Sequence, residues 1–264
     1  MQNSNVYNYE NNLIAFVDLL GFKEAVFQSE TNEKIKKNVD AAMNYSLKIK
    51  CLNDAYNKLA AKDKRVNITV FSDCLVVTCQ KFNDNQNNLY TDFLKGIVNM
   101  VFNLIITGFL VRGGITYGPL YHKDGVCYGP AMNRAYLLES KTAVYPRLLI
   151  DGFALKELAQ DNFIHNSIKY ISPDKSDGLI FLDYLSQKAY FEENDKYYDF
   201  DGNRLDYNKF LKVVRNMIIE NLAKFHNDEK LFKKYQWYKK YYNDTVKKVL
   251  CQLSQEQQDE FLIK

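Results

Sequence analysis

The stretch from Ile14 to Phe22, IAFVDLLGF, limits the possible folds more than any other part of the sequence. Four apolar residues run directly into Asp18, and an apolar run of this length predicts a buried strand. A carboxylate at the end of such a strand is costly unless something pairs with it, and Gly21 permits a sharp turn and a close approach to a ligand. The stretch is therefore either a strand whose aspartate caps the next helix or a strand that ends at a metal site.

A second aspartate, Asp73, lies in a similar setting. The segment 65–80 alternates and is rich in β-branched residues, and Ser72-Asp73 falls where the chain would turn back, which predicts a hairpin with Asp73 at its tip. Two carboxylates with no histidine nearby in the sequence suit a hard cation, Mg²⁺ or Mn²⁺, better than zinc. Glycines beside them are expected to let backbone N–H groups approach anions; these are Gly21, Gly113, Gly114, Gly118 and Gly129.

The remaining periodicities predict an α+β protein, with a largely antiparallel sheet and helices on one face. We expect a core domain over residues 1–204 and a helical extension over 205–264 that packs on it. The expected helices are 23–28, 33–61, 89–107, 131–140 and two segments between 206 and 251, broken near Asn227-Asp228. The further expected strands are 110–121 with a short partner strand after it, 147–151, and a final pair at 179–185 and 196–200.

Composition excludes several classes of protein. The 264 residues carry a net charge of +3 with acids and bases interspersed, which does not indicate nucleic-acid binding. Five cysteines without a CxxC pair favour a reducing cytoplasm over a disulfide scaffold or a zinc site. Residues 1–12 lack the pattern of a signal peptide, and the most apolar window, 97–106, is too short and interrupted to span a bilayer.

Four motifs, in the same order and at similar spacings, resemble those of class III nucleotidyl cyclases. DLLGF from Asp18 resembles the first metal motif, and FSD at 71–73 resembles the second, which is usually written G-D. RGGITYGP at 112–119 resembles a conserved strand, and YGPAMNRA at 128–135 resembles the start of a helix. The resemblance covers roughly residues 12–151.

The resemblance implies a ferredoxin-like core and a head-to-tail homodimer with active sites across the interface. Asp18 and Asp73, assisted by the carbonyl of Leu19, would hold two Mn²⁺ or Mg²⁺ ions. One ion would acidify the ribose 3′-OH of a nucleoside triphosphate, and the other would neutralise the leaving pyrophosphate. Asn133 of the partner subunit would orient the ribose, while Gly21 and Phe22 of the first motif are expected to contact the substrate.

The sequence departs from the family pattern at the positions that read the base and at the position of an arginine. The two purine-reading positions are occupied by Thr69 and Val126, and the position of the transition-state arginine is Leu137. Phe16 or Phe71 would fill the space of a purine's second ring. This pattern resembles the bacterial Pycsar pyrimidine cyclases, which implies conversion of UTP to 3′,5′-cyclic UMP and a role in anti-phage defence through a separate effector protein that senses the product.

Three alternatives remain open: CTP as the substrate, a purine cyclase, and a degenerate cyclase that binds nucleotide without turning it over. Candidates to replace the missing arginine are Arg134, Lys141 and Arg147, although each is also readily explained as a surface or interface charge.

The other candidate functional features are three single histidines and one run of basic and aromatic residues. The three histidines, His122, His165 and His226, are expected to face solvent or to pack. The run FKKYQWYKKYY at 232–242 is typical either of nucleic-acid stacking or, as its helical spacing favours, of an aromatic docking stripe with solvated lysines opposite.

Overall fold

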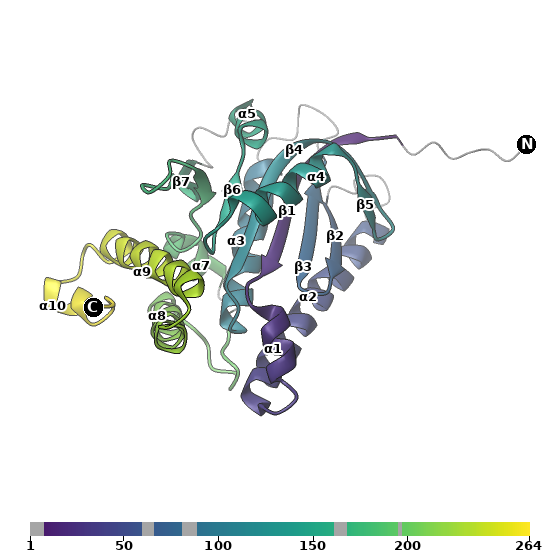
Figure 1. The fold of residues 1–264 in the computed structure, drawn as a ribbon. Coiled ribbons are helices and arrows are strands. Elements are labelled where there is room, and N and C mark those ends of the chain that lie inside the picture. Colours follow the sequence, from purple (N-terminus) through teal and green to yellow (C-terminus); the bar gives the residue numbers. More distant parts are fainter. Residues whose placement is uncertain (1–7, 60–65, 81–88, 161–167, 195–196) are drawn as a thin grey trace, which may run out of the picture.

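The protein is an α+β fold in which one mixed sheet is flanked by helices, as the sequence predicts (Figure 1). The computed structural model describes residues 8–59, 66–80, 89–160, 168–194 and 197–264. The strands are β1 (Glu10–Leu19), β2 (Val66–Phe71), β3 (Cys74–Cys79), β4 (Val111–Lys123), β5 (Val126–Tyr128), β6 (Leu148–Ile150), β7 (Ile171–Pro173) and β8 (Ile180–Leu182). The helices are α1 (Phe22–Gln28), α2 (Glu33–Leu59), α3 (Leu89–Ile106), α4 (Pro130–Leu137), the π-helical turn η1 (Leu138–Thr142), α5 (Gly152–Gln160), the 3₁₀ turn η2 (Ile168–Tyr170), α7 (Lys188–Asn194), α8 (Tyr207–Lys224), α9 (Glu229–Val249) and α10 (Gln255–Asp259).

The first four strands form a ferredoxin-like sheet. The sheet order is β2-β3-β1-β4-β6-β8-β7, and β1 is antiparallel to both β3 and β4. Because β3 lies between β1 and β2, and helices join β1 to β2 and β3 to β4, the connection is a split βαβ unit repeated once. β6 then adds to β4 in parallel. This arrangement places the end of β1 and the β2–β3 turn side by side.

The two faces of β1 are both apolar, which explains why its sequence shows no alternation. Odd-numbered residues from Leu13 to Leu19 join the main core with α3, whereas Ile14 and Phe16 join a smaller cluster with α4. Side chains along a strand alternate between faces, so Asp18 continues the α4 face. The expectation that helices cover one face is wrong for α4, which lies on the face opposite α3 (Figure 1).

The close approach of α4 depends on a glycine in β4. A Cβ atom at Gly114 would lie 2.4 Å from the Cβ of Leu138 and 2.7 Å from the carbonyl oxygen of Ala135. Gly113, Gly118 and Gly129 are similarly crowded by neighbouring atoms. These four glycines therefore serve packing rather than the anion approach expected from the sequence, and of the five candidates only Gly21 is open.

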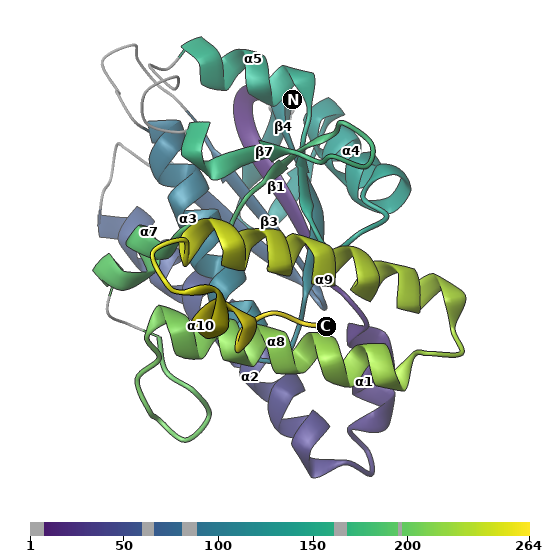
Figure 2. The same cartoon turned by 90° about the vertical axis from the view of Figure 1, so that its left-hand side faces the viewer.

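The C-terminal helices share the main core with the sheet. Apolar residues of α8 and α9 pack in one continuous cluster with those of α3 and β1, and the two helices lie side by side (Figure 2). The division of the chain into a core domain and an extension at residue 204 stays a prediction. α3 has the length and composition of a membrane-spanning helix, yet 61% of it is buried inside the protein, which is typical of a core helix.

The predicted final pair of strands is wrong. β8 pairs with β6 and with β7, and the sequence pattern did not predict β7. Within the described residues 197–204, only an isolated bridge joins Tyr198 to Arg204, around the predicted turn at Asp201-Gly202-Asn203. The segment is too short to pair along a sheet edge, and Tyr197 is instead buried against α3.

Candidate functional site

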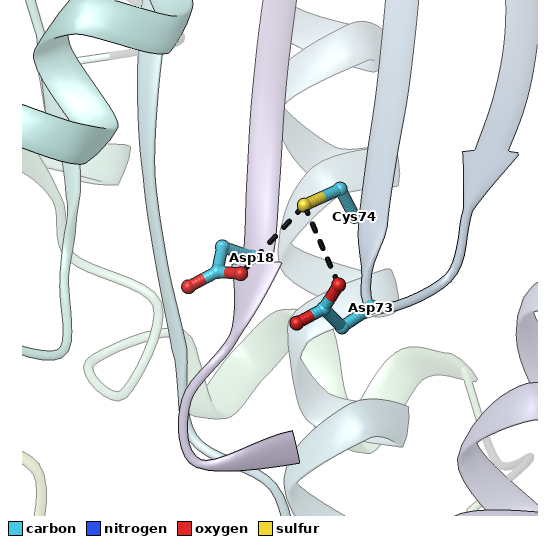
Figure 3. A group of neighbouring side chains, drawn as sticks. All are labelled: Asp18, Asp73 and Cys74. Atoms are coloured by element: carbon cyan, nitrogen blue, oxygen red, sulfur yellow. Dashed lines mark hydrogen bonds between the residues drawn. The ribbon is translucent and has the colours of Figure 1, made fainter. Parts of the chain in front are cut away.

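The fold brings the two predicted aspartates together. Asp18 is the half-buried residue before the last residue of β1. Asp73 lies in the turn between β2 and β3, beside Cys74, which is paired with Asp18 in the sheet. One ligand atom each from Asp18, Asp73 and Cys74 all lie within 4.8 Å of one another (Figure 3). The Cys74 Sγ lies 3.6 Å from an Asp18 oxygen and 3.9 Å from an Asp73 oxygen.

Electrostatics at this cluster favour a bound cation. Burial raises the pKa of Asp18, and the nearby Asp73 charge raises it further, although Arg112 opposes both. Two carboxylates held this close repel each other unless a positive charge lies between or beside them. The Cys74 thiol has its pKa raised, mainly by burial, so it stays protonated and is a poor ligand. The donor set that remains, two carboxylates, fits Mg²⁺ or Mn²⁺.

Arg112 links Asp18 to a residue that sequence reasoning missed. Its Nη2 lies 3.2 Å from Asp18 Oδ2 and also forms an ion pair with Glu139 of η1. Glu139 is buried, and burial raises the pKa of its carboxyl group. One guanidinium group therefore forms ion pairs with two carboxylates. The signal for Glu139 is weak in the sequence, because the helical periodicity continues past α4 and only the π-turn η1 directs Glu139 inward.

The turn that presents Asp73 is held in an uncommon backbone conformation. Ser72 has φ of 52°, a left-handed conformation that residues other than glycine adopt infrequently. The motif that this hairpin resembles has glycine at this point. The serine therefore accepts a conformation costing on the order of 1 kcal/mol, and the turn still places Asp73 beside Asp18.

Thr69, which is predicted to face the base, belongs to a buried polar network. Thr69 Oγ1 lies 2.7 Å from His122 Nε2, and Thr78 Oγ1 lies 2.7 Å from His122 Nδ1. Burial lowers the pKa of His122 to about 4, so the imidazole is neutral and one nitrogen donates while the other accepts. Of the roles expected for His122, exposure to solvent is excluded, because the ring is buried and hydrogen-bonded to side chains of β2 and β3.

The other predicted substrate residues are dispersed. Phe16 is buried against Tyr136 of α4, while Phe71 and Val126 are exposed. The side chain of Phe22 packs in the main core against Phe109, and the expected contact of this residue with the substrate stays a prediction. Gly21 has φ of 78°, and a Cβ atom added to it would meet no atom within 4 Å, which leaves open space beside Asp18.

The backbone of Leu19 lies beside the two aspartates. Its N–H donates to the carbonyl oxygen of Asp73 over 3.1 Å, and its side chain is buried in the main core. This bond fixes the end of β1 to the turn that carries Asp73. The predicted contribution of the Leu19 carbonyl to a metal ion stays a prediction.

Asn133 and Leu137 face outward from α4. Asn133 is exposed and lies outside the cluster that holds the two aspartates of its own chain. Leu137, at the position of the family's arginine, is also exposed. Arg134 does not replace that arginine in this chain, because it donates to the carbonyl oxygen of Tyr117 over 2.8 Å and lies over the ring of Phe153. α4 therefore presents Asn133 and Leu137 outward, which a contribution to a partner's site requires.

The remaining candidates differ in their surroundings. Lys141 and His226 are exposed, and His165 lies outside the described residues. Arg147, expected at the surface or an interface, is instead fully buried and paired with Asp174 and Asp177. The surface assignment of Arg147 is wrong because β6 is an inner strand, so the residue just before it points into the protein.

The aromatic stripe of α9 is confirmed, with one exception that bears on the site. Of the four predicted members of the stripe, Tyr235, Tyr238 and Tyr242 are buried, as a docking stripe requires, and Phe232 is half-buried. Lys234, expected among the solvated lysines, is buried as well. Its position is three residues after Leu231 and four before Tyr238, so it falls within the apolar stripe, and this spacing is the signal that could have found it.

No family model and no curated protein matches the sequence. Similar solved structures include the catalytic core of a rhodopsin-guanylyl cyclase with converted specificity in complex with ATPalphaS, with 18% identity, a TM-score of 0.41, and coverage of 66% of this chain and 96% of that one. The guanylyl cyclase domain of a fusion protein from the aquatic fungus Blastocladiella emersonii has 18% identity, a TM-score of 0.43, and coverage of 66% and 95%. A class III adenylyl cyclase-like ATP-binding protein from Pseudomonas aeruginosa has 13% identity, a TM-score of 0.41, and coverage of 82% and 44%.

Proposed function

We propose that this protein is a divalent-cation-dependent nucleotidyl cyclase. The observation that carries the proposal is the meeting of Asp18 and Asp73 at adjacent strand ends, with the Arg112 guanidinium 3.2 Å from Asp18. Two carboxylates beside one guanidinium form a site that accepts cations and a polyanion together. A nucleoside triphosphate complexed with divalent ions has this combination of charges.

In the proposed reaction the ribose 3′-oxygen attacks the α-phosphorus of the same nucleotide, its proton leaves to solvent, and pyrophosphate departs. Asp18 and Asp73, with the Leu19 carbonyl, would hold two Mg²⁺ or Mn²⁺ ions, which supply charge stabilisation to the attacking and leaving oxygens. Arg112 is placed to bind phosphate oxygens, and its bond to Glu139 fixes its direction. Gly21 leaves the backbone beside Asp18 accessible.

For the base we propose a pyrimidine, with UTP converted to 3′,5′-cyclic UMP and CTP as the second choice. Thr69 offers a short hydroxyl that is already bonded to His122, and Val126 offers no polar group. Leaving a polar edge of a purine unpaired costs roughly 1–3 kcal/mol, so these positions give little reason to prefer ATP or GTP. The two pyrimidines differ mainly in one donor–acceptor exchange, which these residues do not resolve.

We further propose a homodimer in which Asn133 completes the partner's site, because Asn133 is exposed on α4 and lies outside the aspartate cluster of its own chain. Mixing inactive Asp73→Ala and Asn133→Ala proteins should restore about a quarter of wild-type activity, since half of the dimers are mixed and each has one intact site of two. No recovery after verified subunit exchange would favour a site within one chain. A cytoplasmic defence role with a separate effector belongs to the same proposal and is tested by the neighbouring genes.

The deciding experiment is incubation with ATP, GTP, CTP and UTP separately in Mn²⁺, followed by separation of the products. We expect cyclic UMP and pyrophosphate in equal amounts. Cyclic AMP or cyclic GMP as the main product would reject the pyrimidine assignment while keeping the cyclase. Nucleotide binding without any turnover would support the rival class, a degenerate cyclase that only binds nucleotide.

A further inference from the structure

A cavity opens from the aspartate site toward the C-terminal helices. It has a volume of about 840 Å³ and is lined by Asp18 and Gly21 at the end of β1, by Arg112 of β4, and by residues of α1, α2, α8 and α9 that include Lys234. Volumes of several hundred Å³ are typical of small-molecule sites. The Lys224 side chain donates to Gln28 over 3.3 Å and so joins α8 to α1 at its border, where Figure 2 shows these helices near each other.

Lys234 is the buried lysine of this cavity. It is 8% exposed, and among the described residues no hydrogen bond or ion pair reaches its Nζ atom. Burial lowers the pKa of its ammonium group, Arg112 and Lys230 lower it further, and Asp18 opposes them. Lysines are seldom buried unless they are paired, so this side chain requires an explanation.

The neighbouring acids do not supply a partner. Asp18 accepts from Arg112, and Glu139 is paired with the same guanidinium. Lys233, one residue earlier, shows the ordinary arrangement, an exposed ion pair with Glu229 one turn away. Lys234 instead faces a cavity that already contains Arg112. Arg112 is already paired with carboxylates, whereas the ammonium group of Lys234 has no partner within the described residues. An unpartnered ammonium beside a guanidinium and an open glycine can bind phosphate groups.

We propose that Lys234 of α9 binds the polyphosphate of the nucleotide from the same chain that supplies Asp18 and Arg112. The inference rests on the proposed function for the identity of the ligand as a nucleotide, but the polyphosphate subsite itself does not require turnover. It also gives the C-terminal extension a role in substrate binding, because α9 would then complete the phosphate side of the site while Asn133 completes the ribose side.

The test uses inorganic tripolyphosphate with Mg²⁺ as the probe, measured by isothermal titration calorimetry on the full chain. Lys234→Met should weaken binding by about tenfold or more, as expected for the loss of a charge-assisted contact. Lys234→Arg should retain most of the affinity. The matched control is Lys240→Met, an exposed lysine on the same helix, which should leave the affinity unchanged. With UTP, Lys234→Met should raise KM by a similar factor.

Thermal unfolding separates binding from a structural role. Because Lys234→Met removes an unpaired buried charge, its melting temperature should equal or exceed that of the wild type, whereas a structural lysine would lower it. The proposal is overturned if Lys234→Met binds tripolyphosphate as the wild type does, if the wild type does not bind it, or if all Lys234 variants, Lys234→Arg included, fail to fold. Lysine-dependent tripolyphosphate binding in a protein that turns over none of the four triphosphates would reject the cyclase and keep this subsite.

Discussion

Two arginines have very different surroundings: Arg112 lies in β4, and Arg147 lies just before β6, the neighbouring strand of the same sheet. Arg147 precedes β6 and is fully buried between Asp174 and Asp177. Asp174 also accepts from the Trp237 indole over 2.7 Å and from Ser176. The guanidinium carbon lies 5.4 Å from the Trp237 ring centre. Each charge at Arg147 therefore has an opposite charge and further hydrogen bonds.

Arg112 lies where the charges do not balance within the protein. Its guanidinium group is paired with two carboxylates, those of Asp18 and Glu139. Asp73 adds a third carboxylate beside Asp18, and the unpaired Lys234 lines the same cavity as Arg112. An ion-pair network in which every charge has a partner stabilises one structure. A network with an unpaired charge can instead bind a ligand of the opposite charge. This difference agrees with the proposal, in which Arg147 stabilises the fold and Arg112 contributes to the nucleotide site.

The largest effect is expected when Asp73, the second aspartate of the cluster near Arg112, is removed. Asp73→Ala should lower pyrophosphate release from UTP by more than about a hundredfold, because one oxygen-ligand residue of a two-carboxylate site is lost. Circular dichroism and the melting temperature should stay close to wild type, since Asp73 lies in a turn. Unchanged turnover in the folded variant would remove the metal assignment. Asp244→Ala, at an exposed aspartate of α9 that does not line the cavity beside Asp18, serves as the control.

On the Arg147 side the effect should be on stability. Arg147→Met should reduce the free energy of unfolding by about 3–5 kcal/mol, because it leaves Asp174 buried without its partner. Arg112→Met should cost less than half as much, since Glu139 can protonate and Asp18 keeps its position near the cavity. Urea unfolding measures both. Equal losses for the two variants would abolish the distinction between a structural and a functional arginine.

Cation binding should stabilise the open site. Mn²⁺ at a hundred times its dissociation constant should raise the free energy of unfolding by about 2.7 kcal/mol, because it binds the folded state. Asp18→Asn should remove most of this gain, and Asp177→Asn, beside Arg147, should retain it. Differential scanning calorimetry with and without Mn²⁺ distinguishes these results, and an equal gain in both variants would argue for binding elsewhere.

The smallest effect is expected for His122, a buried neutral side chain whose two ring nitrogens are both hydrogen-bonded. Its pKa in the folded protein is about 4, against about 6.5 for an exposed histidine. Because the folded pKa is lowered, stability from the neutral ring is present above about pH 6.5 and is lost as the pH falls toward 4. Between pH 7 and 5 the wild type should lose about 1–2 kcal/mol more than His122→Gln, measured by urea unfolding. Parallel losses would show that His122 does not titrate in this window.

Much of the candidate site was predictable from local sequence. The hairpin around Ser72-Asp73 follows from β-branched alternation with a break, and the strand ending at Asp18 follows from a short apolar run. The resemblance to class III cyclases then implied a ferredoxin-like core, a fold that places these two strand ends together. The predicted strand at 196–200 was wrong because a few apolar residues with alternating exposure do not distinguish a strand from a loop packed on a core.

Local patterns were sufficient to predict most of the elements and the two aspartates, because hydrophobic period, turn residues and motif order are properties of short segments of the chain. The partners of the buried charges came from the three-dimensional packing alone. Arg147, Glu139, His122 and Lys234 look like ordinary polar residues in sequence, and each is buried by a segment far away in the chain. Burial and pairing of a charge depend on what the fold packs around it, and no pattern within one segment records this.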